Sequence, residues 1–147
     1  MLHHQWMQEA HNQALIAQSH DEVPIGAVLI VNDSLVSKSY NQTLTQNDPT
    51  AHAEILCIRE AASILSNHRI ANATLYITLE PCIMCYGAIV QARIDHVVFA
   101  ASDPKSGVFT QPKLSHHLNL NHHPNHTKGI LEKESTELLK QFFKQRR

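Results

Sequence analysis

Four side chains of this sequence have the types and the spacing that metal-assisted hydrolysis needs. His52 and Glu54 lie two positions apart in "TAHAEILCIRE", and Cys82 and Cys85 form a Cys-x-x-Cys pair in "LEPCIMCYGA". A catalytic zinc site uses three protein ligands and keeps its fourth position open for water. His52 and the two cysteines provide three such ligands. Glu54 is then best placed beside the open position, where a carboxylate can take a proton from water and return it to a leaving nitrogen.

The Cys-x-x-Cys pair has a second interpretation, because thiol–disulfide oxidoreductases use the same spacing. A redox pair needs no distant His-x-Glu motif, whereas a three-ligand zinc site needs a third donor, which His52 provides. Both motifs are expected where a strand or a loop runs into the N-terminus of a helix. Free amides and the helix dipole lower thiolate pKa values there, which favours metal binding. We therefore interpret the motifs as one zinc site, with one ion per chain.

The pattern of apolar residues places these motifs on an alternation of helices and strands. Helices are expected at 2–19, from an N-cap at Thr50 to about 67, at 82–93 and at 132–147. Strands are expected at 25–31, 35–40, 73–81 and 95–102, and the segment from 103 to 131 is expected to be loop. This order predicts an α/β fold with three layers, α/β/α, around a central mixed sheet.

Length and cysteine content limit the class of protein. A chain of 147 residues suits a single domain, here 1–147, that folds without disulfides. The N-terminus has no basic region followed by an apolar one, and no apolar run reaches the roughly 18 residues of a membrane span. An odd count of three cysteines argues against a disulfide framework. We expect a cytoplasmic protein with no membrane association.

The charges are unevenly distributed along the chain. Residues 1–104 contain four Lys/Arg and ten Asp/Glu, whereas residues 105–147 contain eight Lys/Arg and three Asp/Glu, so the two segments carry −6 and +5. The basic segment ends in "KQRR" and is a candidate phosphate-binding surface. A solvated helix face is the commoner explanation of such a charge run, so the segment carries no functional claim by itself.

The motifs "HAE" and "PCIMC", with thirty positions between His52 and Cys82, match the H-x-E and P-C-x-x-C signature of the zinc nucleobase deaminases. Within that cytidine/deoxycytidylate deaminase superfamily, the sequence resembles the bacterial tRNA-specific adenosine deaminases. These enzymes convert the wobble adenosine of an arginine tRNA anticodon to inosine. The resemblance extends over most of the chain, through "EVPIGAVLI", "YN", "DPTAHAEI", "ATLYITLEPCIMCYGAIVQARIDHVVFAASDPKSG" and "GILEKE…LLKQFFKQRR".

The resemblance implies a cytidine-deaminase-like fold, a homodimer, and the tRNA anticodon stem-loop as partner. It also implies that Glu54 shuttles protons beside a zinc ion bound by His52, Cys82 and Cys85. An extruded adenine needs apolar walls for its faces and polar groups for its edge. The substrate-binding positions implied by the match are Asn41 at the base edge, the pocket walls Ile25, Ala53 and Leu79, and the RNA-contacting loop residues Asp103, Lys105 and Ser106.

The sequence departs from the family pattern mainly between 109 and 128. His123 stands where an arginine is usual, Pro124 interrupts an otherwise extended segment, and Ser102 also replaces a common arginine. We expect weaker RNA contacts from this stretch. Its histidines have no diagnostic metal spacing and indicate a surface or interface role: His116, His117, His122, His123 and His126.

Three other residues have structural interpretations. Cys57 is expected to be a small buried side chain rather than a ligand. Phe142 and Phe143 fit either a helical core pair or a platform for stacking bases.

Two other functions fit parts of the sequence. A free nucleobase deaminase, acting on guanine or cytosine, would use the same zinc and the same Glu54 but would not need a basic C-terminal segment. A non-catalytic RNA-binding module would keep the basic segment and could lose Glu54. The presence of both features favours the tRNA deaminase.

Overall fold

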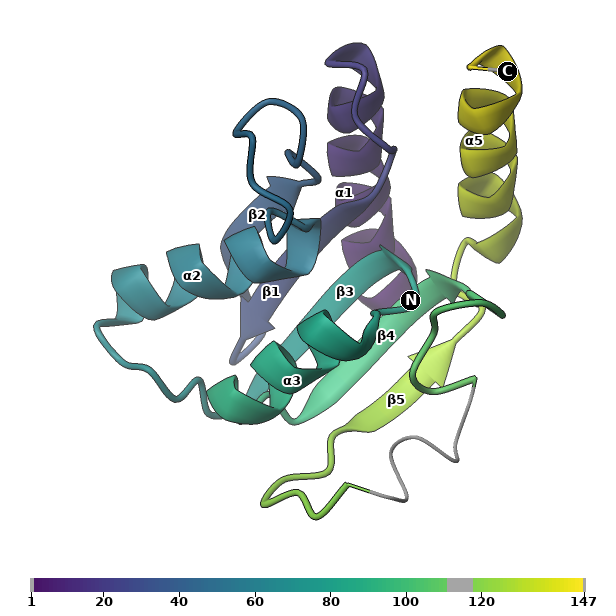
Figure 1. Ribbon diagram of the computed structural model, residues 1–147. Coiled ribbons are helices and arrows are strands. Elements are labelled where there is room, and N and C mark those ends of the chain that lie inside the picture. The colour runs from purple at the N-terminus through teal and green to yellow at the C-terminus, as the bar shows by residue number, and fades with distance from the viewer. Residues whose placement is uncertain (1, 111–117, 147) are drawn as a thin grey trace.

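The computed structural model describes residues 2–110 and 118–146. A mixed five-stranded sheet with the order β2-β1-β3-β4-β5 lies between two layers of helices (Figure 1). The helices are α1 (Leu2–Ser19), α2 (Ala53–Leu65), α3 (Ile83–Ala92) and α5 (Glu132–Gln145). The strands are β1 (Gly26–Val31), β2 (Ser34–Tyr40), β3 (Ala73–Leu79), β4 (His96–Ala101) and β5 (Asn125–Lys128). The expected three-layer α/β/α architecture is confirmed.

The sheet changes from antiparallel to parallel at its centre. β1 pairs antiparallel with β2 and β3, whereas β3, β4 and β5 run parallel to one another. The β1–β2 hairpin turns at Asn32 and Asp33, whose φ values of 49° and 63° are those that a tight hairpin turn needs. α3 provides the crossover between the parallel strands β3 and β4. The start of α3 therefore lies at the carboxyl end of β3, where open α/β sheets place their ligand sites.

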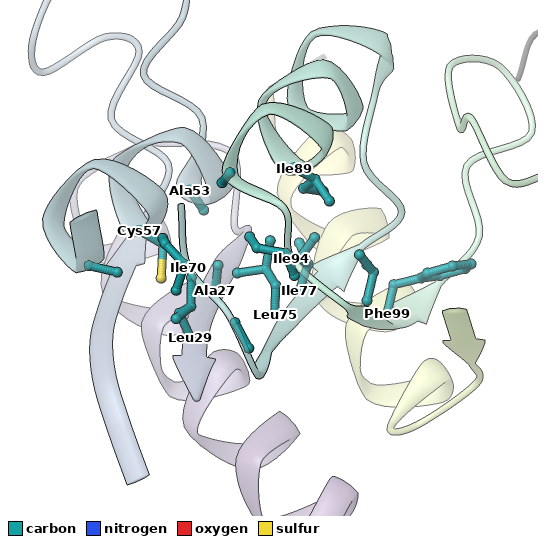
Figure 2. Close-up of a cluster of buried hydrophobic side chains, with 14 residues drawn as sticks. Ala27, Leu29, Ala53, Cys57, Ile70, Leu75, Ile77, Ile89, Ile94 and Phe99 are labelled. Carbon is teal, nitrogen blue, oxygen red and sulfur yellow. The ribbon is translucent and has the colours of Figure 1, made fainter. Parts of the chain in front are cut away.

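Both faces of the sheet are covered by apolar side chains. Figure 2 shows the cluster on the face of α2 and α3, which includes Cys57 and Ile89 from these helices and Leu75, Ile77 and Phe99 from the sheet. A second cluster on the other face packs α1 against β1, β3 and β4. Gly26 allows this close packing, because a Cβ atom there would lie 2.1 Å from the backbone oxygen of Ala10.

The start of α2 differs from the sequence expectation. The helix begins at Ala53, and its N-cap is His52 rather than Thr50. The backbone N–H and the hydroxyl of Thr50 both donate to Asp48 Oδ1, at 2.9 and 2.7 Å, so that Thr50 belongs to the preceding turn. At the other end the helix stops at Leu65, slightly before the expected end near 67.

Strand β5 was not expected, because the segment from 103 to 131 was interpreted as loop. Its sequence, "NHTK", has no apolar alternation, yet it pairs in parallel with β4 at the edge of the sheet. Pro124 lies directly before the strand, a position where a residue without an N–H breaks no ladder hydrogen bond. The extended segment therefore forms next to the proline. Of the histidines in this stretch, His116 and His117 lie outside the described residues.

The two phenylalanines of α5, expected to be either core residues or a platform for stacking bases, differ in burial. Phe142 is 4% exposed, whereas Phe143 is 51% exposed. Phe142 is therefore a core residue, and Phe143 is available to a ligand. Over 2–110 and 118–146, no helix has the length and apolarity that a membrane crossing needs.

Candidate active site

The N-termini of α2 and α3 bring the two motifs together. His52 is the N-cap residue of α2 and Cys82 is the N-cap residue of α3, and both have extended backbone conformations. Neither side chain caps its own helix, so both are free to point at a common partner. Cys85 follows on the first turn of α3 and is fully buried. Two helix ends thus direct three donor atoms to one place.

The three donors have the spacing of a tetrahedral metal site. His52 Nδ1 lies 3.8 Å from Cys82 Sγ and 3.5 Å from Cys85 Sγ, and all three ligand atoms lie within 4.8 Å of one another. Zn–S bonds of about 2.3 Å and Zn–N bonds of about 2.0 Å in a tetrahedron separate N from S by about 3.5 Å. The donor set therefore fits a zinc ion. Within the described part of the chain it is the only group of three His, Cys, Asp or Glu residues with such a spacing.

The neighbours of Cys82 favour the thiolate form of this side chain. Hydrogen bonds from Cys85 and His52 lower the pKa of the Cys82 thiol to about 3, although burial opposes the shift. The hydrogen bond to Cys82 raises the pKa of His52 in return. The Cys85 pKa is raised, first by its hydrogen bond to Cys82 and then by burial. Cys82 is thus the more readily deprotonated of the two cysteines, and metal binding would displace the proton of Cys85.

Glu54 lies beside this group on the first turn of α2. Its side chain is 4% exposed, and burial raises the pKa of its carboxyl, while hydrogen bonds and the charge of His52 oppose the shift. A carboxyl whose pKa is raised by burial holds a proton more readily than a free one, which suits a group that must carry protons. The geometry therefore suits the proton carrier that the sequence predicts.

Backbone hydrogen bonds place Asn41 and Ile25 near the start of α2. The Asn41 N–H donates to Ile25 O at 3.0 Å, and the Gln42 N–H donates to Ala51 O at 2.9 Å. Asn41 is buried, at 5% exposure, and Ala53 is fully buried in the cluster that Ile25 also contacts. Three of the expected base-binding residues are thus gathered around the beginning of α2.

The other expected substrate-binding residues line one cavity. Leu79, Asp103, Lys105 and Ser106 surround a space of about 460 Å³, together with Val23, Ser102, Pro104, Leu139 and Phe143. Val23 links this cavity to the first group, because its carbonyl accepts a hydrogen bond of 2.8 Å from the Ile25 N–H. Asp103 Oδ1 accepts hydrogen bonds from the backbone N–H groups of Lys105 and Ser106, at 3.1 and 3.2 Å. The loop therefore has a defined shape.

Comparison with known proteins agrees with this chemistry. The family model of the MafB19-like deaminases matches residues 1–147. A tRNA-specific adenosine deaminase of Bacillus subtilis (strain 168) is 43% identical over 143 residues, which cover 97% of this chain and 89% of the relative. The chain belongs to the tRNA-specific adenosine deaminase family. Its catalytic signature and its fold are those of a deaminase.

Two solved structures of deaminases differ in how well they superpose on this chain. A structure from a study of A-to-I editing by tRNA:A34 deaminases superposes with a TM-score of 0.88 at 43% identity, covering 92% of this chain and 99% of the other. A guanine deaminase of Bacillus subtilis superposes with a TM-score of 0.65 at 32% identity, covering 75% and 68% of the two chains. The tRNA-specific adenosine deaminase family is thus the better match in both sequence and structure.

The structure adds Leu139 and Lys140, which the sequence analysis did not place at the site. It brings Phe143 and Lys144, the candidates for base stacking and phosphate binding, to the same cavity. Leu139 and Phe143, one turn apart on α5, line the cavity beside Leu79. A neighbouring cavity of about 590 Å³ adds Lys140 and Lys144 from the same helix. The spacing of four between these residues was visible in the sequence, but which face of α5 meets the site depends on tertiary packing. Helix α5 thus brings an aromatic ring and two cations to these cavities.

Two histidines of the His-rich stretch have structural contacts. The His122 imidazole Nε2 donates to Ile94 O at 2.6 Å, and the His126 ring lies 4.4 Å from that of Phe109. Cys57 is buried, and burial raises its pKa to about 12, which leaves an inert thiol rather than a ligand.

Proposed function

We propose that this protein hydrolytically deaminates the wobble adenosine of a tRNA anticodon, in an arginine tRNA, to inosine. The observation that carries the proposal is the convergence of His52, Cys82 and Cys85 on one point beside the buried Glu54, in a chain 43% identical to a tRNA-specific adenosine deaminase. Water replaces the exocyclic amino group at C6 of the base, and ammonia leaves. The overall reaction is adenosine plus water to inosine plus ammonia.

His52, Cys82 and Cys85 would hold one zinc ion, which when bound would supply Lewis-acid activation of water near neutral pH. Glu54 takes the proton of the attacking water and delivers protons to the ring and to the leaving nitrogen. Its burial keeps bulk water away from these transfers. The thiolate of Cys82, the sulfur of Cys85 and the imidazole of His52, once metal binding displaces their protons, would give the ion the N and S donors that zinc prefers.

The substrate would enter as an extruded base from an anticodon stem-loop. Asn41 offers an amide to the base edge, whereas Ile25, Ala53 and Leu79 supply apolar surfaces to its faces. The flanking nucleotides would meet the loop that carries Asp103, Lys105 and Ser106. Stacking on Phe143 and phosphate contacts from α5 would hold the RNA without reading its sequence. We further propose that the protein acts in the cytoplasm, as a homodimer.

The proposal is tested by incubating the zinc-loaded protein with an arginine-type anticodon stem-loop that has adenosine at the wobble position. Inosine should form in this RNA, and no product should form from free adenine, guanine or cytosine at the same concentration. A stem-loop with guanosine at the wobble position is the matched control. Rapid turnover of a free base, with no inosine in the stem-loop, would instead make the protein a nucleobase deaminase.

A further inference from the structure

The carboxylate of Glu80 is enclosed beneath the loop of residues 102–110. Glu80 is 3% exposed and lies between Leu79, which lines the cavity, and Pro81, which precedes the metal-binding motif. The backbone N–H of Asp103 donates to Glu80 Oε1 at 2.8 Å, and the N–H of Thr110 donates to Oε2 at 2.5 Å. The Thr110 hydroxyl donates to Oε1 as well. One side chain thus ties together both ends of the loop.

Gly107 shows how closely the loop is fitted to this carboxylate. A Cβ atom at position 107 would lie 2.2 Å from Glu80 Cδ and 2.3 Å from Glu80 Oε1. These distances leave no space for any side chain unless the carboxylate or the loop moves. Gly107 itself donates from its N–H to Asp103 O at 2.8 Å, which closes the loop over Glu80.

Burial of the Glu80 carboxylate has an unfavourable free energy of desolvation. Removing its charge from water costs several kcal/mol unless hydrogen bonds replace the lost hydration. The three donors from Asp103 and Thr110 provide this replacement only in the observed loop conformation. Any other conformation would leave the buried charge without partners, so Glu80 selects a single shape of the loop.

The loop shape matters to the site because of what the loop carries. Asp103 Oδ1 in turn orders the backbone of Lys105 and Ser106, and all three residues line the cavity with Leu79. On the other side of Glu80, Val108 N–H donates to Pro81 O at 3.2 Å. The segment that provides Cys82 is therefore coupled directly to the loop that faces the cavity.

We propose that Glu80 is a positioning residue for RNA: it holds the 102–110 loop in the shape that receives the nucleotides beside the extruded base. The inference rests on the proposed function for the identity of the ligand. Glu80 takes no part in proton transfer, which belongs to Glu54. Its replacement therefore affects the capture of RNA and leaves the metal site and the chemical step in place.

Glu22 offers a matched comparison elsewhere in the molecule. It is fully buried and accepts three hydrogen bonds under a different loop, from Leu44 N at 3.1 Å, Thr45 N at 2.6 Å and Thr45 Oγ1 at 2.6 Å. Glu22→Gln therefore changes the same chemistry as Glu80→Gln without touching the 102–110 loop. The Glu22→Gln variant therefore measures how far loss of a buried carboxylate affects the stability of the whole protein, apart from any effect on the 102–110 loop.

The first test is hydrogen exchange of the protein alone. In Glu80→Gln, amides of residues 102–110 should exchange at least about ten-fold faster, because hydrogen bonds to a charged acceptor are lost, while β4 keeps its protection. In Glu22→Gln the faster exchange should appear around residues 42–48 and not in 102–110. Unchanged exchange of 102–110 in Glu80→Gln would overturn the inference. This readout needs no RNA, so it stands even if the wild type forms no inosine and the proposed function fails.

The second test separates positioning from catalysis. With the wobble-adenosine stem-loop, Glu80→Gln should raise KM about ten-fold or more, with kcat within about three-fold and the zinc content unchanged. Thr110→Val removes one donor, keeps the backbone bonds and should raise KM about two- to five-fold. This second variant keeps the inference testable if Glu80→Gln does not fold. A fall in kcat at constant KM in either variant would contradict it.

Discussion

At the residue scale, the proposed chemistry depends on Glu54 and on the donor atoms of His52, Cys82 and Cys85 beside it. The motif residues that provide these atoms are local in sequence, which is why their roles could be predicted before the fold was known. His52 and Glu54 share one helix start, and Cys82 and Cys85 share another. Glu80 could not be found in this way, because its partners lie 23 and 30 positions further along the chain. Only the folded loop shows what its carboxylate binds.

Replacing Glu54 tests the proton carrier. Glu54→Gln keeps the size of a side chain that is 4% exposed, so the fold and the zinc should remain. Its kcat on the stem-loop should fall by about 10²–10⁴-fold, the usual contribution of general acid–base catalysis. Glu60→Gln, an exposed carboxylate on the same helix, serves as the control. Activity of Glu54→Gln within a few-fold of the wild type would remove Glu54 from the mechanism.

Metal analysis tests the ligand set. The wild type should contain about one zinc per chain, and both Cys82→Ser and Cys85→Ser should lose it, because a hydroxyl is a poor replacement for a thiolate ligand. Cys57→Ser should retain the metal, since that thiol bonds to Ser37 rather than to the site. Stoichiometric zinc in both Cys82→Ser and Cys85→Ser would refute the assignment.

At the scale of elements, loops and helix ends position the site. The sequence predicted the helices and central strands, but not β5 or the N-cap of α2. Helices and central strands follow from apolar periodicity. β5 does not, because its four polar residues are held by pairing with β4 rather than by their own pattern. The N-cap of α2 was misassigned for a similar reason, since the Thr50 hydroxyl was already bound to Asp48. The sequence pattern of a segment does not decide its structure where a tertiary or turn contact binds the same backbone or side-chain group.

The carboxyl of Glu22 connects a loop to acid stability. Burial alone would raise its pKa, but hydrogen bonds from Thr45 and Leu44 outweigh burial and lower it. A group with a lowered folded pKa stabilises the protein above its unfolded pKa of about 4.3, and this contribution is lost as the pH falls through the folded pKa. Glu22→Gln should therefore lower the free energy of unfolding by about 1–3 kcal/mol at pH 7. The difference from wild type should shrink below about pH 4 in denaturant titrations; a constant difference would contradict this account.

The two phenylalanines of α5 should behave differently although they are adjacent. Phe142→Ala should lower the free energy of unfolding by about 3–5 kcal/mol, because the ring is 4% exposed. Phe143→Ala should cost less than about 1 kcal/mol, since its ring is 51% exposed, yet it should raise the KM for the stem-loop through lost stacking. Thermal unfolding and steady-state kinetics of the two variants measure both effects. Equal losses of stability would contradict the assignment of Phe143 to the ligand-facing surface.

At the scale of the whole molecule, charge is segregated along the chain. The −6 segment contains the His-x-Glu and Cys-x-x-Cys motifs. The +5 segment contains α5, whose Lys140 and Lys144 line a cavity next to Phe143. The sequence showed the asymmetry but not its placement, because the packing of α5 beside β4 brings these lysines near Leu79. Cations beside a site for an extruded base suit a phosphate backbone.

Salt dependence tests this arrangement. Binding of the stem-loop should weaken as salt rises, because each neutralised phosphate releases counterions. Lys140→Ala and Lys144→Ala should each weaken binding and reduce the slope of log Kd against log salt by about one or less. Lys38→Ala, on β2, provides a control cation outside the α5 cavities. An unchanged slope in the double variant would place the RNA elsewhere.

The central claim is that this site deaminates an adenosine within RNA, and nucleoside analysis of a treated tRNA tests it most directly. An unmodified arginine tRNA with adenosine at the wobble position would be incubated with the zinc-loaded protein, then digested and sequenced. The account predicts inosine at the wobble position, one ammonia released per inosine, and conversion by Glu54→Gln that is at least about 10²-fold slower. A tRNA that retains its wobble adenosine, while the same protein sample deaminates a free nucleobase, would contradict it.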